Sequence, residues 1–186
     1  VPNKPYYQEP PMLKEMSWQD AVTIASPYPY VLITGTDKDG KPNAMGAGWW
    51  SFTSMKPPLM LVSIGKTRYT LECIRHTKDF VVCFPSREQA AGAWMCGGKS
   101  GRGRDKLAEA GLKAIPAKKV KPPVIDGSTA AFECTVVNEV ETGDHIVLIG
   151  EVVATHGDAD RTMHIYSVFY SKLIAMDTEG TIAMKP

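Results

Sequence analysis

The sequence predicts a mainly β fold, a closed antiparallel barrel with a few helices on its outside. Several short segments of apolar and β-branched residues read as strands, whereas few segments show helical spacing. Strands and helices do not alternate regularly, which argues against a doubly wound parallel sheet. No period of 20–50 residues repeats, which excludes solenoids and propellers. Closure into a barrel is one way in which an antiparallel sheet avoids exposed edges.

The size and charge of the chain narrow the class of protein. Its 186 residues are enough for one domain with its own core, and we expect a single domain over residues 1–186. Its 21 Lys and Arg and 20 Asp and Glu residues give a net charge of +1, so neither nucleic acid nor a membrane is an expected partner. The longest apolar runs, at residues 59–62 and 146–149, are far shorter than the roughly 18 residues that span a bilayer.

The first third of the chain predicts an arm, a helix and three strands. Four prolines in residues 1–16 disfavour a regular helix there and predict an extended arm. An amphipathic helix is predicted over residues 18–25, ended by Pro27. The strands expected next are residues 30–34, one return strand over 43–53 after the turn signal at 37–40, and a buried strand over 59–64.

The middle of the chain predicts two helices around a strand. Residues 67–77 are expected to be helical because Leu71 and Ile74 share one face, and a strand over 80–84 follows. Ser86 and Gln89 form a capping-box pattern that starts a helix towards Met95. The elements expected after it are a short helix over 105–110 closed by Gly111, and strands over 130–140, 146–155 and 168–176, the first two joined by a turn at 143–144.

The cysteines predict no metal site. They form no C-x-x-C pair, and no histidine lies beside them at the spacing of metal ligands. Three lie in apolar segments, where a free cysteine behaves as a small buried hydrophobe, and reduced thiols fit the cytoplasmic location that we expect. A disulfide, and a redox role for Cys96 beside Gly97-Gly98, stay open. The four residues are Cys73, Cys83, Cys96 and Cys134.

Gly98-Lys99-Ser100 matches only the end of a phosphate-binding P-loop. The full motif needs glycine at position 93, where the chain has Ala93, and a strand before the loop, where a helix is predicted. We therefore do not expect an NTPase. The basic residues of this glycine-rich stretch fit either a contact to a ligand phosphate or a solvated loop, whereas the neutral net charge argues against an RNA contact. They are Lys99, Arg102, Arg104 and Lys106.

Two neighbouring segments, residues 43–51 and 63–70, carry a more informative pattern. Gly46 and Gly48 remove side chains from a predicted strand, which would let a flat heterocycle approach the backbone. Hydroxyl and cationic residues then gather at a predicted strand-to-helix junction, which suits a phosphate monoester. They are Ser63, Lys66, Thr67, Arg68 and Thr70. The pattern fits a planar ring with a phosphate tail, and it equally fits an ordinary tight turn beside core tryptophans.

The order of the motifs resembles the flavin reductase-like family with an FMN-binding split β-barrel, which includes flavoredoxins and ferric reductases. The resemblance runs over residues 28–175, nearly the whole chain. The residues that carry it are Thr34-Gly35, Asp39-Gly-Lys-Pro-Asn-Ala-Met45, Trp50-Ser51, Lys56-Pro-Pro-Leu59, Arg68-Tyr-Thr70, Asp79-Phe-Val-Val82, Ser100-Gly101 with Asp105-Lys106, Pro123-Val-Ile-Asp-Gly127, Phe132-Glu-Cys134, Gly143-Asp-His145 and Gly150-Glu-Val152. Gly46-Ala47-Gly48-Trp49 departs from the family pattern, because it lacks two hydroxyls that could contact a flavin.

The resemblance implies FMN as cofactor and a split β-barrel with peripheral helices. It implies that residues 43–51 line the isoalloxazine ring and that residues 63–70 hold the ribityl phosphate, with Arg68 and Thr70 as its main ligands. The implied cofactor-binding residues are Asn43, Ala44, Met45, Gly46, Ala47, Gly48, Trp49, Trp50, Ser51, Ser63, Ile64, Gly65, Lys66, Arg68, Tyr69, Thr70, Ser100 and Lys106.

The resemblance also implies a catalytic candidate, His145, because the Gly-Asp-His turn of the family lies near the exposed face of the flavin. There the imidazole would meet a nicotinamide donor or a partner subunit; the alternative is a strand-opening histidine that only bonds across the turn. We expect a homodimeric FMN oxidoreductase in which NAD(P)H reduces flavin or an acceptor such as ferric iron. The alternatives are a flavoredoxin-type carrier reduced by a protein partner, and a non-catalytic ligand-binding barrel.

Overall fold

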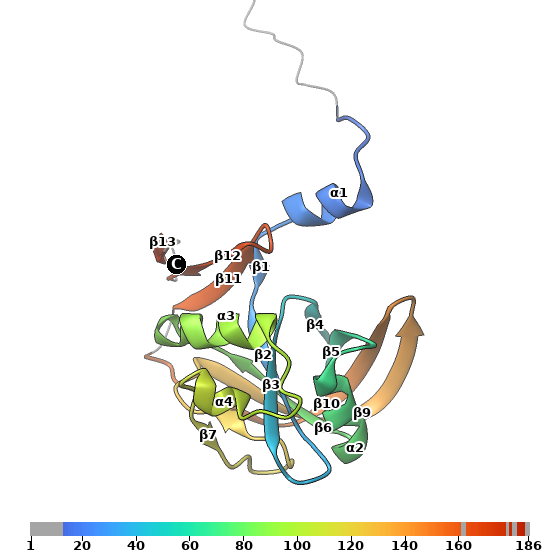
Figure 1. Cartoon of the computed structure of the whole chain (residues 1–186), viewed down its shortest axis with the longest axis vertical. Helices are drawn as coiled ribbons and strands as arrows, with labels where there is room; N and C mark the ends of the chain where they lie inside the picture. The colour runs from blue at the N-terminus through green and yellow to red at the C-terminus, as the bar shows by residue number, and fades with distance from the viewer. Residues whose placement is uncertain (1–12, 161–162, 178, 180–181, 185–186) are drawn as a thin grey trace, which may run out of the picture.

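The computed structural model describes residues 13–160, 163–177, 179 and 182–184. Most of the regular structure is antiparallel β, which confirms the predicted class (Figure 1). The helices are α1 (Trp18–Ile24), α2 (Tyr69–Thr77), the 3-10 turn η1 (Arg87–Gln89), α3 (Ala90–Gly98) and α4 (Lys106–Glu109). The strands are β1 (Tyr28–Pro29), β2 (Val31–Thr36), β3 (Pro42–Ala47), β4 (Trp50–Met55), β5 (Pro58–Gly65), β6 (Asp79–Phe84), β7 (Ala114–Ile115), β8 (Val124–Ile125), β9 (Ala130–Thr142), β10 (His145–Gly157), β11 (His164–Val168), β12 (Lys172–Met176) and β13 (Ile182–Met184).

A seven-stranded sheet forms the body, in the order β3-β2-β6-β9-β10-β5-β4. Its two edge strands, β3 and β4, are consecutive in the chain, and only Gly48 and Trp49 separate them. Ala47 and Trp50 can therefore be at most about 11 Å apart, so the sheet curls until its edges approach each other at this corner. The single strand predicted over residues 43–53 is wrong. Its halves pair with β2 and β5 on opposite edges because the chain turns at Gly48.

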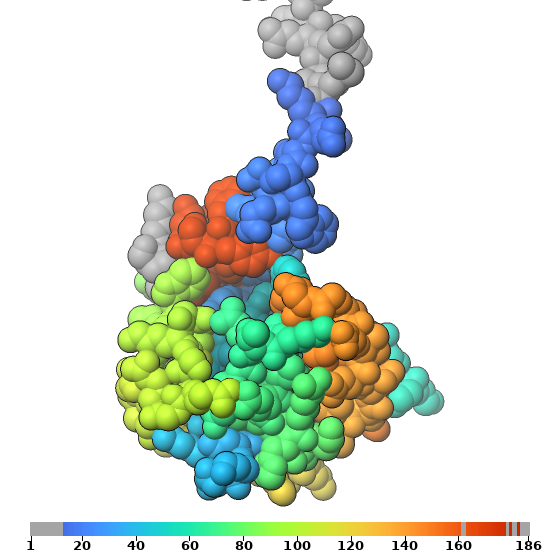
Figure 2. Space-filling view, turned by 45° about the vertical axis from the view of Figure 1, so that its right-hand side comes forward, coloured from blue at the N-terminus to red at the C-terminus, as the bar shows by residue number. Residues whose placement is uncertain are grey.

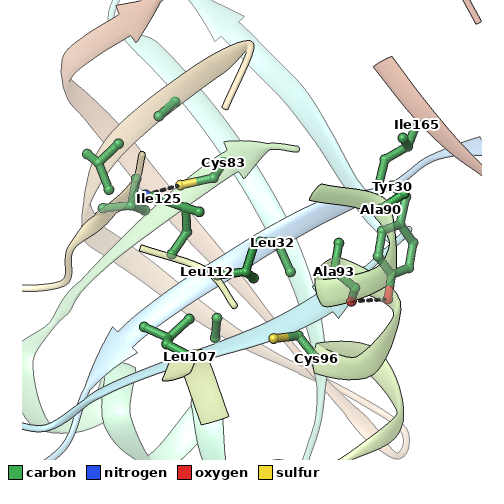
Figure 3. Close-up of a cluster of buried hydrophobic side chains, with 14 of the residues drawn as sticks. Tyr30, Leu32, Cys83, Ala90, Ala93, Cys96, Leu107, Leu112, Ile125 and Ile165 are labelled. Atoms are coloured by element: carbon green, nitrogen blue, oxygen red, sulfur yellow. Dashed lines mark hydrogen bonds between the residues drawn. The ribbon is translucent and has the colours of Figure 1, made fainter. Parts of the chain in front are cut away.

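The curled sheet encloses one apolar cluster and carries a second on its outer face. Strand β2 is buried along its whole length because its alternate side chains enter the two clusters. Val31 and Ile33 belong to the inner cluster, with Phe80 and Leu148. The outer cluster contains Tyr30, Leu32, Cys83, Cys96, Leu107, Leu112 and Ile125, and α3 and α4 cover it (Figure 3).

The helices follow the predicted signals with small shifts at their ends. Helix α2 begins at Tyr69, two residues after the predicted start. The capping box before α3 is present, since the Ser86 amide donates to Gln89 Oε1 at 3.0 Å. Helix α4 starts at the cap residue Asp105, whose Oδ1 accepts from the Ala108 amide at 3.1 Å, and Gly111 ends it with a φ of +64°. Of the predicted arm, residues 1–12 lie outside the described residues, and residues 13–16 form neither helix nor strand.

A second sheet, in the order β1-β11-β12-β13, lies beside α3 at the other side of the body from α2 (Figure 1). The strand predicted over residues 168–176 is confirmed for residues 172–176 (β12) and wrong before them, because β11 and β12 form a hairpin that turns at Phe169 and Tyr170. Both turn residues have a φ of +51°, which is a left-handed conformation. Glycine and asparagine adopt it most readily, and the turn contains neither, so the sequence gives no signal for it. The Tyr30 amide donates to Ile165 O at 2.9 Å and joins this sheet to the start of β2.

Within the described part of the chain, none of the helices has both the length and the apolar composition that crossing a bilayer requires.

Candidate functional site

A cavity of about 450 Å³ opens where the β3–β4 corner, the end of α3 and the β11–β12 hairpin meet. Nine of its lining residues come from the predicted site: Met45, Gly46, Ala47, Gly48, Trp49, Ser63, Gly65, Arg68 and His145. The sequence analysis missed the other six, which are Tyr30, Trp94, Gly97, Gly98, Ser167 and Tyr170. The lining combines aromatic rings with glycines that expose the backbone, so the space suits a planar ligand.

Tyr30 forms the wall between β3 and α3. Its hydroxyl donates to Ala93 O at 3.3 Å (Figure 3). An added Cβ at Gly46 or at Gly97 would lie 1.7 Å or 2.2 Å from this hydroxyl. Position 46 is therefore glycine because the tyrosine hydroxyl occupies the space of a side chain. The sequence analysis had instead explained this glycine by a ligand that approaches the backbone. Gly98, by contrast, faces open space, since nothing lies within 4 Å of an added Cβ at this position.

Trp49 and Tyr170 close one side of the cavity mouth. Trp49 Nε1 donates to the Tyr170 hydroxyl at 2.9 Å, which links the β3–β4 corner to the hairpin. The Trp49 ring lies 4.8 Å from the His145 ring, and the Tyr170 ring lies 5.5 Å from Tyr28. The mouth is thus built from segments that are 121 residues apart.

His145 is held in one orientation by its neighbour in the turn. Its Nδ1 lies 2.7 Å from Asp144 Oδ1, and this bond lowers the pKa of the Asp144 carboxyl. Because a carboxylate only accepts, Nδ1 is the donor in this pair and Nε2 is the nitrogen left for another partner. Nε2 lies 3.7 Å from the Cβ position of Gly65, a residue of the cavity wall.

A second pocket of about 100 Å³ adjoins the cavity and shares Met45, Arg68 and Gly97 with it. Five further residues of the predicted site line it: Asn43, Tyr69, Thr70, Ser100 and Lys106. Its remaining lining residues are Thr67, Cys96, Lys99 and Gly101. Three hydroxyls and three cations surround a small space, which is the chemistry of an anion site.

The three cations of this pocket have no anionic partner. In the described part of the chain, none of Arg68, Lys99 and Lys106 makes an ion pair or a side-chain hydrogen bond, whereas four cations outside the pocket are paired. These pairs are Lys66–Glu141, Arg75–Glu139, Arg102–Glu72 and Arg104–Glu109. Lys106 is only 3% exposed. Burial lowers its pKa, Cys96 opposes this, and the nearby Arg68 and Arg104 lower it further. A bound anion would compensate this buried charge.

Asn43 also has an unused atom in this pocket. The side chain is 3% exposed, and its Nδ2 donates to Thr70 Oγ1 at 2.7 Å. Its Oδ1 is buried without a hydrogen-bond partner among the described residues. If the two amide atoms exchange places, Oδ1 accepts from the Thr70 hydroxyl and Nδ2 becomes a free donor. An anionic or hydroxylated ligand would satisfy that donor.

Five residues of the predicted site lie outside both pockets. Ala44 and Ile64 point into the two core clusters, because side chains on β3 and β5 alternate between faces. Trp50 Nε1 donates to Pro29 O at 3.0 Å, and its ring packs against Phe84. Ser51 donates to Phe52 O at 3.0 Å, and Lys66 pairs with Glu141. Their side chains are therefore used for packing and surface contacts.

The cysteines are buried and free, as predicted. Cys96 borders the small pocket, and burial raises the pKa of its thiol. A protonated thiol is a poor nucleophile, so this environment argues against a redox role. Among the described residues, no group of His, Cys, Asp or Glu side chains could hold a metal ion.

Comparison with known proteins gives one consistent family. The flavin reductase like domain model matches residues 24–171. An uncharacterized protein of Archaeoglobus fulgidus is 41% identical over 131 residues, which cover 70% of this chain and 72% of that protein. The flavoredoxin of Desulfovibrio vulgaris (Miyazaki F) has a TM-score of 0.73 at 26% identity and 92% coverage of each chain. The flavin reductase PheA2 has a TM-score of 0.69 at 25% identity, covering 90% of this chain and 95% of that chain.

These likenesses confirm the split β-barrel fold that the sequence resemblance implied. Because the family model covers residues 24–171, and with them most of both pockets, the chain belongs to the flavin reductase-like domain family.

Proposed function

We propose that this chain binds FMN and uses NAD(P)H to reduce flavin or an acceptor such as ferric iron. The observation that carries the proposal is the junction of an aromatic cavity of about 450 Å³ with a small pocket whose three cations form no ion pair among the described residues. FMN has this composition, a planar ring system joined to one terminal phosphate. Membership of the flavin reductase-like family supports a flavin as the ligand.

The residues of the small pocket fit the phosphate. Arg68 lies at the N-terminus of α2, where backbone N–H groups and the helix dipole favour an anion. Lys106 would regain a compensating charge, and the Ser100 hydroxyl offers a hydrogen bond. With its two amide atoms exchanged, Asn43 would accept from the Thr70 hydroxyl and donate through Nδ2 to the phosphate.

The cavity residues fit the ring. Trp49 and Tyr170 cover one side of the mouth, and Tyr30 forms the wall between β3 and α3. When bound, FMN would supply the hydride and electron chemistry, so the chain needs to bind and orient it. Asp144 orients His145 through Nδ1, and we propose that Nε2 contacts the nicotinamide donor.

The homodimer is a further part of the proposal. Apolar side chains are exposed on β4 and on the middle of β9 and β10, which are strands of one sheet. Phe52 is 52% exposed and Met55 is 89% exposed, with Val137 and Val153 also exposed. A second copy of the chain would cover such a face. Light scattering of the protein eluted from a sizing column should give twice the monomer mass. Phe52→Glu should shift the measured mass towards that of the monomer.

The similarity to flavoredoxin favours a second candidate, an electron carrier reduced by a protein partner. Anaerobic stopped-flow mixing of the FMN-loaded protein with NADH and NADPH separates the two. Prompt loss of the yellow absorbance supports the reductase. Bound FMN that neither nucleotide reduces supports the carrier. A purified protein that stays colourless and does not bind added FMN supports a non-catalytic barrel and contradicts the proposal.

A further inference from the structure

A glycine-rich loop between α3 and α4, residues 99–105, covers the small pocket, and we name it the strap. Lys99, Ser100 and Gly101 supply part of the pocket lining. Gly101 approaches Asn43 so closely that an added Cβ would lie 2.0 Å from Asn43 Oδ1. In Figure 2 the yellow-green segment that contains the strap lies against the green segment around α2. A phosphate in this pocket would therefore lie against the strap.

Few contacts within the strap itself fix its conformation. It lies among the glycines at positions 97, 98, 101 and 103, and Gly103 has a φ of +73°. Its internal hydrogen bonds are local: the Arg104 amide donates to Gly101 O at 3.3 Å, and the Arg102 amide donates to Ser100 Oγ at 3.3 Å. Loops with few fixed contacts open at low free-energy cost. Arg104 ties the C-terminal end of the strap to Glu109 of α4, and a second side chain ties its middle to α2 across the pocket.

That link is the side chain of Arg102. Its guanidinium carbon lies 4.7 Å above the centre of the Tyr69 ring, and Nη2 pairs with Glu72 Oε1. Both partners belong to α2. The Tyr69 hydroxyl in turn donates to Asp37 Oδ2 at 2.8 Å, which fixes the ring beneath the guanidinium. Stacking and an ion pair on the same side chain give Arg102 one defined position.

We propose that Arg102 is a positioning residue that holds the strap closed over the small pocket and so limits how fast a phosphorylated flavin leaves. The inference rests on the proposed function, because it takes FMN as the ligand. Arg102 does not line either pocket, and its side chain is 59% exposed. Its effect would therefore pass through the position of Ser100 and Gly101.

The dissociation rate of FMN tests this role. Loaded protein is mixed with an excess of a flavin-scavenging apoprotein, and the release is followed by fluorescence. An exposed ion pair and a cation–π contact together suggest that Arg102→Ala raises the dissociation rate about tenfold. The association rate should stay within about twofold, since the pocket itself is unchanged. Glu72→Gln keeps the stacking and should give a smaller increase.

Arg104→Ala is the matched control. Arg104 lies on the same strap and pairs with Glu109 of α4, but it touches neither Tyr69 nor the small pocket. Because its charge lies near Lys106, its removal should raise FMN release clearly less than Arg102→Ala does. Riboflavin, which lacks the phosphate, is the second control. It should dissociate from Arg102→Ala and from the unaltered protein at the same rate. Equal FMN release from Arg102→Ala and the unaltered protein, an equal increase in Arg104→Ala, or an equal effect on riboflavin would each overturn the inference.

A second measurement separates this inference from the proposed function. Amide hydrogen exchange of peptides over residues 98–105 needs no ligand. Arg102→Ala should exchange faster there than the unaltered protein, whereas Arg104→Ala should match the unaltered protein at residues 99–102. Failure of all variants to bind FMN would contradict the proposed function alone. Unchanged exchange in Arg102→Ala would contradict the closed strap, whatever the ligand.

Discussion

The hydroxyl of Tyr30 occupies the place that a side chain at position 46 would need: an added Cβ at Gly46 would lie 1.7 Å from it. The same hydroxyl lies 2.2 Å from the Cβ position of Gly97 on the facing helix. The phenol is therefore wedged between β3 and α3, and burial raises its pKa.

Gly46→Ala should destabilise the protein, because the added Cβ would overlap the buried Tyr30 hydroxyl and displace it from its bond to Ala93. Overpacking of this kind costs about 1–3 kcal/mol in the free energy of unfolding. Gly98→Ala is the control, since nothing lies within 4 Å of its Cβ position. Urea denaturation of both variants measures the difference. A Gly46→Ala protein as stable as Gly98→Ala would show that the tyrosine is not confined.

Arg68→Ala should weaken FMN binding without loss of stability. Arg68 has no partner in the described chain, so its loss removes a charge-assisted contact to the ligand and no contact within the protein. The expected cost is about 1.5–3 kcal/mol of binding free energy. Arg75→Ala, which breaks only the exposed pair with Glu139, should leave the FMN dissociation constant unchanged. Calorimetric titration of the apoproteins compares them, and equal affinities would place the phosphate elsewhere.

Lys106→Met should weaken FMN binding and yet leave the free energy of unfolding equal or higher. Burial lowers the pKa of Lys106, so the ligand-free folded state holds this proton less tightly than the unfolded chain does. Between the lowered pKa and 10.5, only the unfolded chain stays protonated, and the unfolding free energy rises with pH. This part of the rise should be missing in Lys106→Met.

Denaturation of both apoproteins from pH 7 to pH 10 measures that difference, and FMN titration measures the affinity. A Lys106→Met protein with lower stability than the unaltered protein at neutral pH would contradict an uncompensated buried cation.

Glu133 should be a main source of acid sensitivity. Its side chain is fully buried, and it accepts from the Lys118 amide at 2.8 Å and the Lys119 amide at 2.6 Å, with His156 Nε2 at 2.5 Å. Burial alone would raise its pKa, but these three bonds outweigh burial and lower it. The stabilisation is therefore complete above the ordinary value of 4.5 and is lost as the pH falls through the lowered pKa.

Glu133→Ala leaves two backbone donors without a partner and should cost on the order of 3 kcal/mol at neutral pH. Glu133→Gln keeps one acceptor and should cost less, with a flatter stability profile between pH 5 and pH 3 than the unaltered protein. Parallel acid profiles for the unaltered protein and Glu133→Gln would assign the acid sensitivity to another group.

His145→Ala should slow the reduction of bound FMN by NAD(P)H far more than it weakens FMN binding, because the contacts to the phosphate remain. The reason is that His145 lines the aromatic cavity and is absent from the small pocket. Positioned polar groups of this kind contribute up to about 10²–10⁴-fold to a rate. His76→Ala, at an exposed position on α2, is the control. If stopped-flow reduction is as fast in His145→Ala as in His76→Ala, His145 has no role in the reaction and only forms a hydrogen bond in the turn.

The predictions that succeeded depend on local chemistry. The strands β5, β6, β9 and β10, the capping box before α3 and the Gly143 turn each lie in a short stretch of chain, where apolar residues and backbone freedom are visible in the residue types. Thr67, Arg68 and Thr70 reach one pocket because they lie at a single strand-to-helix junction.

The predictions that failed concern places where contacts between distant segments determine the path of the backbone. The strand ends at Ala47 because β3 and β4 pair with different strands. The chain also turns at Phe169 and Tyr170, although neither residue type is typical of a turn. The sequence by itself determined the strands, the helix ends and the cluster of phosphate-type residues, because those follow from neighbours in the chain. Only the tertiary structure decided that Tyr30, Trp49 and Tyr170 share one cavity and that Arg68 and Lys106 lack partners, since both facts depend on contacts between segments far apart in the sequence.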